Sequence, residues 1–263
     1  MSTILDKIVA TRLEEVSRQK LRVSLSDLQA NIDSSAVRNS MANRLLITGS
    51  SGIIAEFKRK SPSKGVINDQ VQPGIVSKGY ADSGASGLSV LTDSSYFGGS
   101  DADFIDARNA NPLTPLLRKD FMVDEYQLYE SRVLNADVIL LIAAVLEKTQ
   151  ISRYTSIAHE LGMEVLLELH DEAEIEKVDL QVDMIGINNR NLKDFKVDMD
   201  RSLRLLDQLP PEAVKISESG LSEPETVDFL RSRGFHGFLM GENFMKTEDP
   251  AVTCANFISR LNH

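Results

Sequence analysis

The sequence lacks the features that mark secreted and membrane-spanning proteins. Its 263 residues include one cysteine, Cys254, so no disulfide can form within the chain and nothing indicates an oxidising compartment. The longest strongly apolar run, VILLIAAVL at 138–146, is too short to cross a bilayer. The opening stretch MSTILDKIVATRLEEV alternates apolar with charged residues, unlike a secretory signal. We therefore expect a soluble, cytoplasmic protein.

Basic residues are also scarce. Lysine and arginine number 29 against 39 acidic residues, which gives a net charge of −10 and a pI near 5.0. Such a chain repels nucleic acid and anionic membranes unless its positive charge is locally concentrated, so we expect neither as a partner. The four histidines (His159, His170, His236 and His263) show no metal-ligand spacing, and Cys254 falls in the last expected helix. We predict no metal site.

One segment does concentrate positive charge. The stretch AEFKRKSPSKG at 55–65 holds four basic residues. A nuclear signal or an RNA-binding patch is conceivable. The apolar strand that leads into the segment and the net charge of the chain argue against both.

A regular alternation of apolar runs and amphipathic segments begins after Gly52. Before it, an apolar stripe at helical spacing covers 4–16, and a weaker one covers 25–47. Eight strand-like runs follow, at 53–57, 87–92, 115–121, 137–143, 163–170, 184–190, 213–220 and 237–241. Helices are expected near 70–83, 101–110, 124–135, 147–161, 171–181, 199–208, 222–233 and 248–261.

Eight successive strand–helix units favour a closed α/β architecture, the (β/α)₈ TIM barrel. An open doubly wound sheet is the alternative, but no glycine-rich dinucleotide turn follows the first strand. We expect one domain over 1–263, with 1–47 as an N-terminal helical extension packed on the barrel.

Ionisable and polar side chains collect where five of the eight strands end. In such barrels the reactive groups stand at the carboxyl ends of the strands. The residues there are Glu56, Lys58, Lys119, Asp120, Glu168, His170, Asn188, Asn189, Arg190, Ser217, Glu218 and Ser219. A ring of acids and amines suits proton transfer, because each group shifts the pKa of its neighbours.

Side-chain alternation assigns these groups to a face. In the first strand Glu56 and Lys58 share one face with Ile54, while Phe57 lies on the other. Phe57 suits the outer face under the helices, so Glu56 and Lys58 should point into the barrel mouth. Arg59 and Lys60 then begin the first loop, where we expect them in solvent.

Glycines after the last two strands predict a phosphate site. SESGL at 217–221 and LMGEN at 239–243 follow the strands whose loops form the usual phosphate cradle of these barrels. Glycine lets backbone N–H groups approach a phosphate closely. Ser61, just after the first strand, could complete the set of donors.

These segments together resemble the indole-3-glycerol-phosphate synthase family of tryptophan biosynthesis, and the resemblance covers nearly the whole chain. The matching blocks are ILDKIV, IIAEFKRKSPSKG, LTDSSYFGGS, PLLRKDF, DEYQLYESRVLNADVILLIAAVL, LLELH, IGINNRNL, ISESGL and LMGENFM. Asn189 and Asn191 depart from the INSRDL form of the family.

The resemblance implies a (β/α)₈ barrel lyase that needs no cofactor. It closes the indole ring of 1-(2-carboxyphenylamino)-1-deoxyribulose 5-phosphate with loss of CO₂ and water. Lys119 matches the general acid, Glu168 the acid/base of the dehydration, and Lys58 the residue beside the substrate carboxylate, with a possible acid role.

The remaining matches concern orientation and binding. Glu56, Asn188 and Glu218 match groups that orient the lysines and the substrate. The matches to the binding pocket are Ser61, Gly220, Gly241 and Glu242 for phosphate, Arg190 and Ser219 for the site wall, and Phe97 and Phe121 for the anthranilate ring. We expect an anionic small-molecule substrate and a monomer.

Two other functions stay open. A related barrel enzyme, phosphoribosylanthranilate isomerase, would use a Cys/Asp pair at strand ends, and no cysteine stands at a strand end here. A non-catalytic RNA-associated protein built around the basic segment would be retained on heparin at physiological salt.

Overall fold

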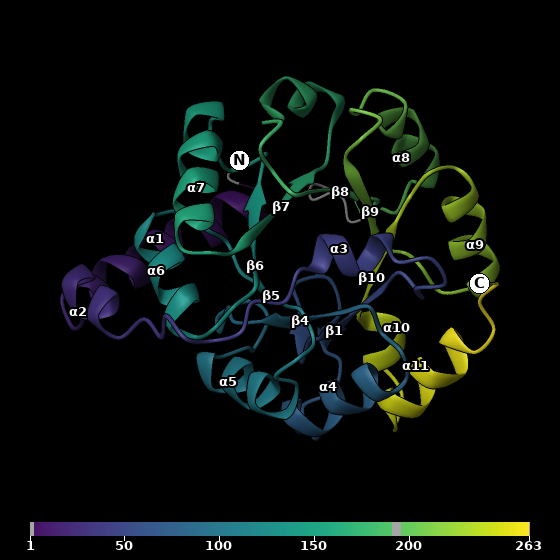
Figure 1. Cartoon of the computed structure of the whole chain (residues 1–263), viewed down its shortest axis with the longest axis horizontal. Coiled ribbons are helices and arrows are strands. Elements are labelled where there is room, and N and C mark those ends of the chain that lie inside the picture. Colours follow the sequence, from purple (N-terminus) through teal and green to yellow (C-terminus); the bar gives the residue numbers. More distant parts are fainter. Residues whose placement is uncertain (1–2, 191–195, 263) are drawn as a thin grey trace.

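The structure, a computed structural model, describes residues 3–190 and 196–262. Eight parallel strands close into a barrel in the order β1-β10-β9-β8-β7-β6-β5-β4, and helices surround it (Figure 1). The barrel strands are β1 (Ile53–Phe57), β4 (Gly87–Leu91), β5 (Leu116–Lys119), β6 (Val138–Ile142), β7 (Glu164–Leu169), β8 (Met184–Asn188), β9 (Val214–Glu218) and β10 (Gly237–Met240). The predicted TIM barrel is confirmed, and the open-sheet alternative is wrong.

Helices connect successive barrel strands. Those around the barrel are α4 (Pro73–Asp82), α5 (Asp101–Ala110), α6 (Tyr126–Val133), α7 (Lys148–Glu160), α8 (Met199–Leu206), α9 (Pro224–Ser232), α10 (Glu242–Met245) and α11 (Pro250–Ile258). Three more precede the barrel: α1 (Ile4–Lys20), α2 (Leu25–Ala30) and α3 (Met41–Leu46). A two-stranded hairpin, β2 (Lys60–Ser61) with β3 (Gly65–Val66), lies in the loop after β1.

Alternation along each strand builds two cores. Ile53 belongs to the large cluster between the strands and the helices, while its neighbour Ile54 belongs to the cluster inside the barrel. Leu166 and Leu167 divide in the same way on β7. Because parallel strands covered on both faces bury every residue, these runs are continuously apolar.

Helix α3 closes the amino end of the barrel. It lies across the ring of strands in Figure 1, and its Met41 and Leu45 are buried in the interior cluster. Gly87 makes room for this plug, since a Cβ there would lie 2.8 Å from the Met41 Cε. Glu164 accepts the backbone N–H groups of Met41 and Ala42 at 2.8 and 3.1 Å, which satisfies free donors at the helix start.

The segment expected to be helical over 171–181 is different. It forms only a short 3₁₀ helix, η1 (Glu172–Lys177). Ile175 and Val178 are partly buried against the core, but Leu180 is 77% exposed. The segment therefore has too narrow an apolar face to dock a longer helix.

The first two helices pack on the barrel's outer layer. Both α1 and α2 contact α6, beside which they lie in Figure 1. Arg12 of α1 pairs with Asp120 at 2.5 Å, and Lys20 pairs with Asp124 at 2.7 Å. The division into one domain with an extension over 1–47 stays a prediction.

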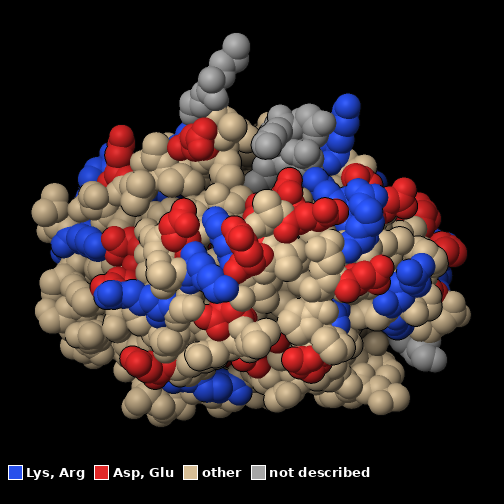
Figure 2. Space-filling model, turned by 90° about the horizontal axis from the view of Figure 1, so that it is seen from above, with Lys and Arg blue, Asp and Glu red and all other residues tan. Residues whose placement is uncertain are grey.

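Charges of both signs are interspersed on the surface. On the face that Figure 2 shows, basic and acidic side chains lie side by side rather than in separate areas. Among residues 3–190 and 196–262, no helix is long and apolar enough to cross a membrane.

The barrel plug yields a stability prediction. Met41→Ala removes a fully buried side chain and leaves a cavity, so we expect a loss of about 2–5 kcal/mol in the free energy of unfolding. The matched control is Leu46→Ala on the same helix, where the side chain is 54% exposed and the expected change is within about 0.5 kcal/mol. Urea unfolding measures both, and equal losses would contradict the role given to α3.

Candidate active site

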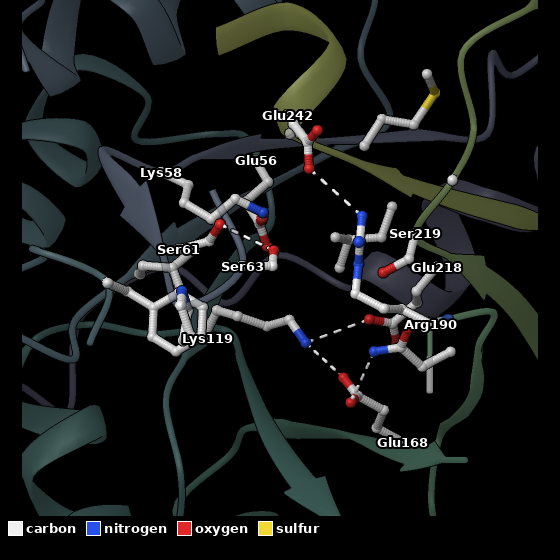
Figure 3. A pocket seen from close by; sticks show the side chains of 18 of the residues that line it. Glu56, Lys58, Ser61, Ser63, Lys119, Glu168, Arg190, Glu218, Ser219 and Glu242 are labelled. Carbon is white, nitrogen blue, oxygen red and sulfur yellow. Dashed lines mark hydrogen bonds and ion pairs between the residues drawn. The ribbon is translucent and has the colours of Figure 1, made fainter. Parts of the chain in front are cut away.

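A cavity of about 260 Å³ opens at the carboxyl ends of the barrel strands. All fourteen residues given a catalytic or binding role from the sequence line it, whereas three other polar residues expected at the strand ends, His170, Asn189 and Ser217, do not. The fourteen are Glu56, Lys58, Ser61, Phe97, Lys119, Phe121, Glu168, Asn188, Arg190, Glu218, Ser219, Gly220, Gly241 and Glu242. Figure 3 shows ten of the lining residues by name, converging from several strands. Asn191 lies outside the described residues.

The ammonium group of Lys119 lies between two carboxylates. Its Nζ is 2.5 Å from Oε2 of Glu168 and 3.2 Å from Oε2 of Glu218, contacts that Figure 3 draws as dashed lines. Asn188 donates from Nδ2 to the other oxygen of Glu168 at 3.1 Å. The ends of β5, β7, β8 and β9 thus meet in one network of hydrogen bonds and ion pairs.

This network separates the pKa values of its members. Burial acts to lower the pKa of Lys119, but the charges of Glu168, Glu218 and Glu56 outweigh burial and raise it, so the amine is protonated at neutral pH. Burial alone would raise the pKa of Glu168, but Lys119 and His170 hold it well below its usual range.

Glu218 shifts in the opposite direction. Burial, together with the nearby charge of Glu168, raises the pKa of Glu218 to about 8 despite the attraction of Lys119. One carboxylate of the pair is therefore ionised near neutral pH while the other holds a proton, as expected of two acids that share a buried cation.

The missing side chain of Gly186 makes room for Glu218. A Cβ at Gly186 would lie 2.2 Å from Oε1 of Glu218. This oxygen is buried and has no hydrogen-bond partner among the described residues.

Ser219, which follows Glu218 in the sequence, adopts the left-handed conformation with φ of 68°, a strained state for a residue other than glycine.

A second acid–amine pair stands at the end of β1. Nζ of Lys58 is 2.8 Å from Oε1 of Glu56, and both side chains face the cavity as predicted. Phe57 is buried on the outer side. The expectation that Arg59 lies in solvent is wrong, because its guanidinium pairs with Asp103 and covers the Phe57 ring at 4.9 Å.

Lys60, expected in solvent, is half-buried and makes a contact at the surface. Its Nζ donates to the Ser95 carbonyl oxygen at 2.8 Å, which connects the hairpin after β1 to the loop after β4. The basic side chains of the segment 55–65 therefore make separate contacts and form no continuous binding patch.

One wall of the cavity is hydrophobic. The rings of Phe97 and Phe121 lie 6.1 Å apart between centroids. Three residues of α1 complete the wall: Ile4, Leu5 and Ile8. Sequence reasoning placed them in a packing stripe, and nothing in that stripe distinguishes a side chain facing the cavity from one facing the barrel.

Another part of the cavity lining consists of small, polar and basic residues. Ser61, Gly220 and Gly241 belong to it, together with Ser222 and Lys246, which the sequence reasoning missed. Lys246 lies beyond the last strand in a segment assigned to a loop, so no strand-end pattern pointed to it.

Glu242 connects the loop after β8 with the loop after β1. Its carboxylate is 3.4 Å from Arg190 and 3.8 Å from Lys64, and Figure 3 shows the contact with Arg190.

Asn189, one of the departures from the family pattern, is fully buried and donates to the Ser219 carbonyl oxygen at 2.8 Å. It therefore ties β8 to the loop after β9.

No group of three or more His, Cys, Asp or Glu side chains suited to a metal ion occurs in the part of the chain that the structure describes. The arrangement instead offers a buried ammonium acid, two carboxylates of different protonation, a hydrophobic wall, and a polar end with basic side chains.

Comparison with known proteins places this chain in a family. The family model for indole-3-glycerol phosphate synthase matches residues 5–257. The indole-3-glycerol phosphate synthase of Bacteroides thetaiotaomicron is 48% identical over 263 residues, which cover 99% of this chain and 100% of the relative. That of Neisseria gonorrhoeae is 46% identical over 256 residues, covering 95% and 96%.

Solved structures share the fold at low sequence identity. The tryptophan synthase alpha subunit of Legionella pneumophila matches with a TM-score of 0.61 and 11% identity, over 85% of this chain and 97% of that one. The 3-hexulose-6-phosphate synthase of Salmonella typhimurium matches with a TM-score of 0.62 and 13% identity, over 80% and 100%. From its sequence, the chain belongs to the indole-3-glycerol phosphate synthase family.

Proposed function

We propose that this chain closes the indole ring of 1-(2-carboxyphenylamino)-1-deoxyribulose 5-phosphate, with Lys119 as the general acid. The family membership supports the reaction. The observation that carries the role of Lys119 is its position, since the ammonium projects into the cavity between Glu168 and Glu218.

Ring closure needs a proton donor at the substrate carbonyl. The ring carbon that bears the carboxylate attacks this carbonyl carbon, a C–C bond forms, and the carbonyl oxygen takes a proton from Lys119. The neighbouring carboxylates keep Lys119 charged until that moment. The amine gives up its proton because the developing alkoxide is a far stronger base than either carboxylate.

Two losses complete the aromatic product. The C–C bond to the carboxylate breaks, CO₂ leaves, and its electron pair restores the benzene ring. The new hydroxyl takes a proton from Lys58, the second amine that lines the cavity, and leaves as water, while a proton departs from the adjacent carbon. Lys58 regains a proton from water, which balances the one consumed when CO₂ leaves. Glu168, ionised and 2.5 Å from Lys119, is placed to take this proton and to exchange it with the lysine.

The cavity lining offers partners for both ends of the substrate. Phe97 and Phe121 provide an apolar surface for the anthranilate ring, and Lys58 lies at the cavity edge where the substrate carboxylate would bind. Ser61, Gly220, Gly241 and the backbone of Glu242 form the phosphate end, near Arg190. Burial of the ring positions the attacking carbon against the carbonyl.

The isomerase alternative lacks its expected catalytic pair. The single cysteine, Cys254, is buried in α11 and is not among the residues that line the cavity. A monomeric state, a cytoplasmic location and independence of any cofactor stay predictions.

The direct test follows indole fluorescence after the carboxyphenylamino-deoxyribulose phosphate is added to the purified chain. We expect product without an added cofactor. No product from folded protein under these conditions would contradict the proposal.

Replacing Lys119 tests the general acid. We expect Lys119→Met to lower kcat by about 10²–10⁴-fold, because the proton donor is gone. The control is Lys215→Met: Lys215 is also a buried strand lysine, but its Nζ donates to the Pro211 carbonyl oxygen and it does not line the cavity. Circular dichroism checks folding, and near-normal turnover in a folded Lys119→Met protein would exclude the role.

Glu218 predicts a pH-dependent stability. Its pKa is about 8 in the folded state and near 4.5 when unfolded, so between these values the folded state retains a proton that the unfolded state has lost. Stability then falls as pH rises through this window, by up to about 1.4 kcal/mol per pH unit. Glu218→Gln stays neutral in both states, so this component disappears.

The measurement is urea unfolding of both proteins at pH 5, 6, 7 and 8. We expect the variant to gain stability relative to the parent as pH rises. Parallel curves for the two proteins would show that Glu218 does not hold the extra proton.

A further inference from the structure

His170 follows β7, two residues beyond Glu168, and takes no part in the proposed reaction steps. It is 6% exposed and is not among the residues that line the cavity. It therefore lies behind the site without reaching a bound substrate. A buried histidine beside a carboxylate can fix the orientation and the charge of that carboxylate.

The imidazole contacts one oxygen of Glu168. Its Nε2 lies 3.0 Å from Oε1, the same oxygen that accepts the Asn188 amide at 3.1 Å. The other oxygen, Oε2, is the one that contacts Lys119. The two oxygens of the carboxylate thus have different partners.

Neither ring nitrogen of His170 has a hydrogen-bond partner of good geometry among the described residues, although both are buried. The contact with Glu168 is therefore close but poorly aligned for a hydrogen bond. Catalytic hydrogen bonds often have this form before substrate binds and tighten in the complex.

We propose that His170 is a positioning residue that, with Asn188, holds Oε1 of Glu168 so that Oε2 faces the substrate as the proton-transfer oxygen. With its proton on Nε2, the ring donates to Oε1. The inference rests on the proposed function, in which Glu168 exchanges protons with Lys119 and the substrate.

The need for such a partner arises during the reaction. When Lys119 turns toward the substrate carbonyl, Glu168 loses its closest positive charge. A carboxylate left in a buried site without donors would draw a proton and cease to act as a base. His170 and Asn188 remain as donors on Oε1 and keep Oε2 ionised.

Other charged groups surround the ring. Glu174 of η1 accepts the His170 backbone N–H at 2.7 Å and, with Asp171, adds negative charge near His170. Lys119 reaches Glu168 from β5, and Lys177 of η1 is occupied by the carbonyl oxygens of Ala143 and Leu146.

Two substitutions separate positioning from packing. His170→Leu removes the donor and keeps an apolar body of similar size, whereas His170→Gln keeps a donor near the position of Nε2. We expect the leucine variant to lose at least about tenfold in kcat and to shift the acidic limb of its pH profile upward by about one unit. KM should change little, because His170 does not touch the substrate.

The glutamine variant should keep kcat within about threefold of the parent, which a packing role would not require. The matched control is His159→Gln: its Nε2 also contacts a carboxylate, Asp183 at 2.9 Å, but on the outer helix α7. That variant should match the parent in kcat and pH profile.

A titration without substrate tests the contact independently of activity. In protein labelled at the glutamate side-chain carboxyl carbon, NMR follows Glu168, with Glu168→Gln identifying its signal. We expect the apparent pKa of Glu168 to rise in His170→Leu and to stay low in His170→Gln. This arm still decides the matter if the parent protein forms no indole product, which would contradict only the proposed function.

Two results would overturn the inference. One is a Glu168 titration that is the same in the parent and in His170→Leu. The other, decisive even if the leucine variant does not fold, is a folded His170→Gln protein that loses more than tenfold in kcat.

Discussion

The site depends on one constraint: an ammonium ion must stay charged where water is largely excluded. Burial of Lys119 favours its neutral form, and only the adjacent carboxylates reverse this. Their own burial would in turn favour protonation, so the group is stable only as a unit. The barrel makes such a unit possible, because side chains from β5, β7 and β9 reach a common point at the ends of separate strands.

The surrounding architecture maintains this unit. Gly186 leaves the volume that Glu218 occupies, and Asn188 orients Glu168. Interior side chains such as Ile54 and Leu166 fill the barrel below and keep the charges at the mouth. Removal of any one carboxylate would therefore change the proton affinity of the others as well as a single contact.

Much of this arrangement could be predicted from the sequence, because it depends on local periodicity. Continuous apolar runs located the eight strands, and the two-residue alternation assigned Glu56 and Lys58 to the mouth and Phe57 to the outer layer. The family resemblance supplied the roles, which periodicity cannot. Two features were not predicted, because they depend on contacts between distant segments. They are the pairing of Arg59 with Asp103 and the wall formed by Ile4, Leu5 and Ile8. The helix expected over 171–181 was wrong for a different reason: the apolar face of this segment is too narrow to dock a helix of that length.

The helix α3, which plugs the amino end of the barrel, also determines which end is open to solvent. With Met41 seated against Gly87 and the interior filled by aliphatic side chains, the described part of the barrel has its open space at the carboxyl end. The same cavity opening would then serve substrate, carbon dioxide, water and the indole product. Carbon dioxide released in this cavity would therefore leave on the same side of the barrel by which the substrate enters.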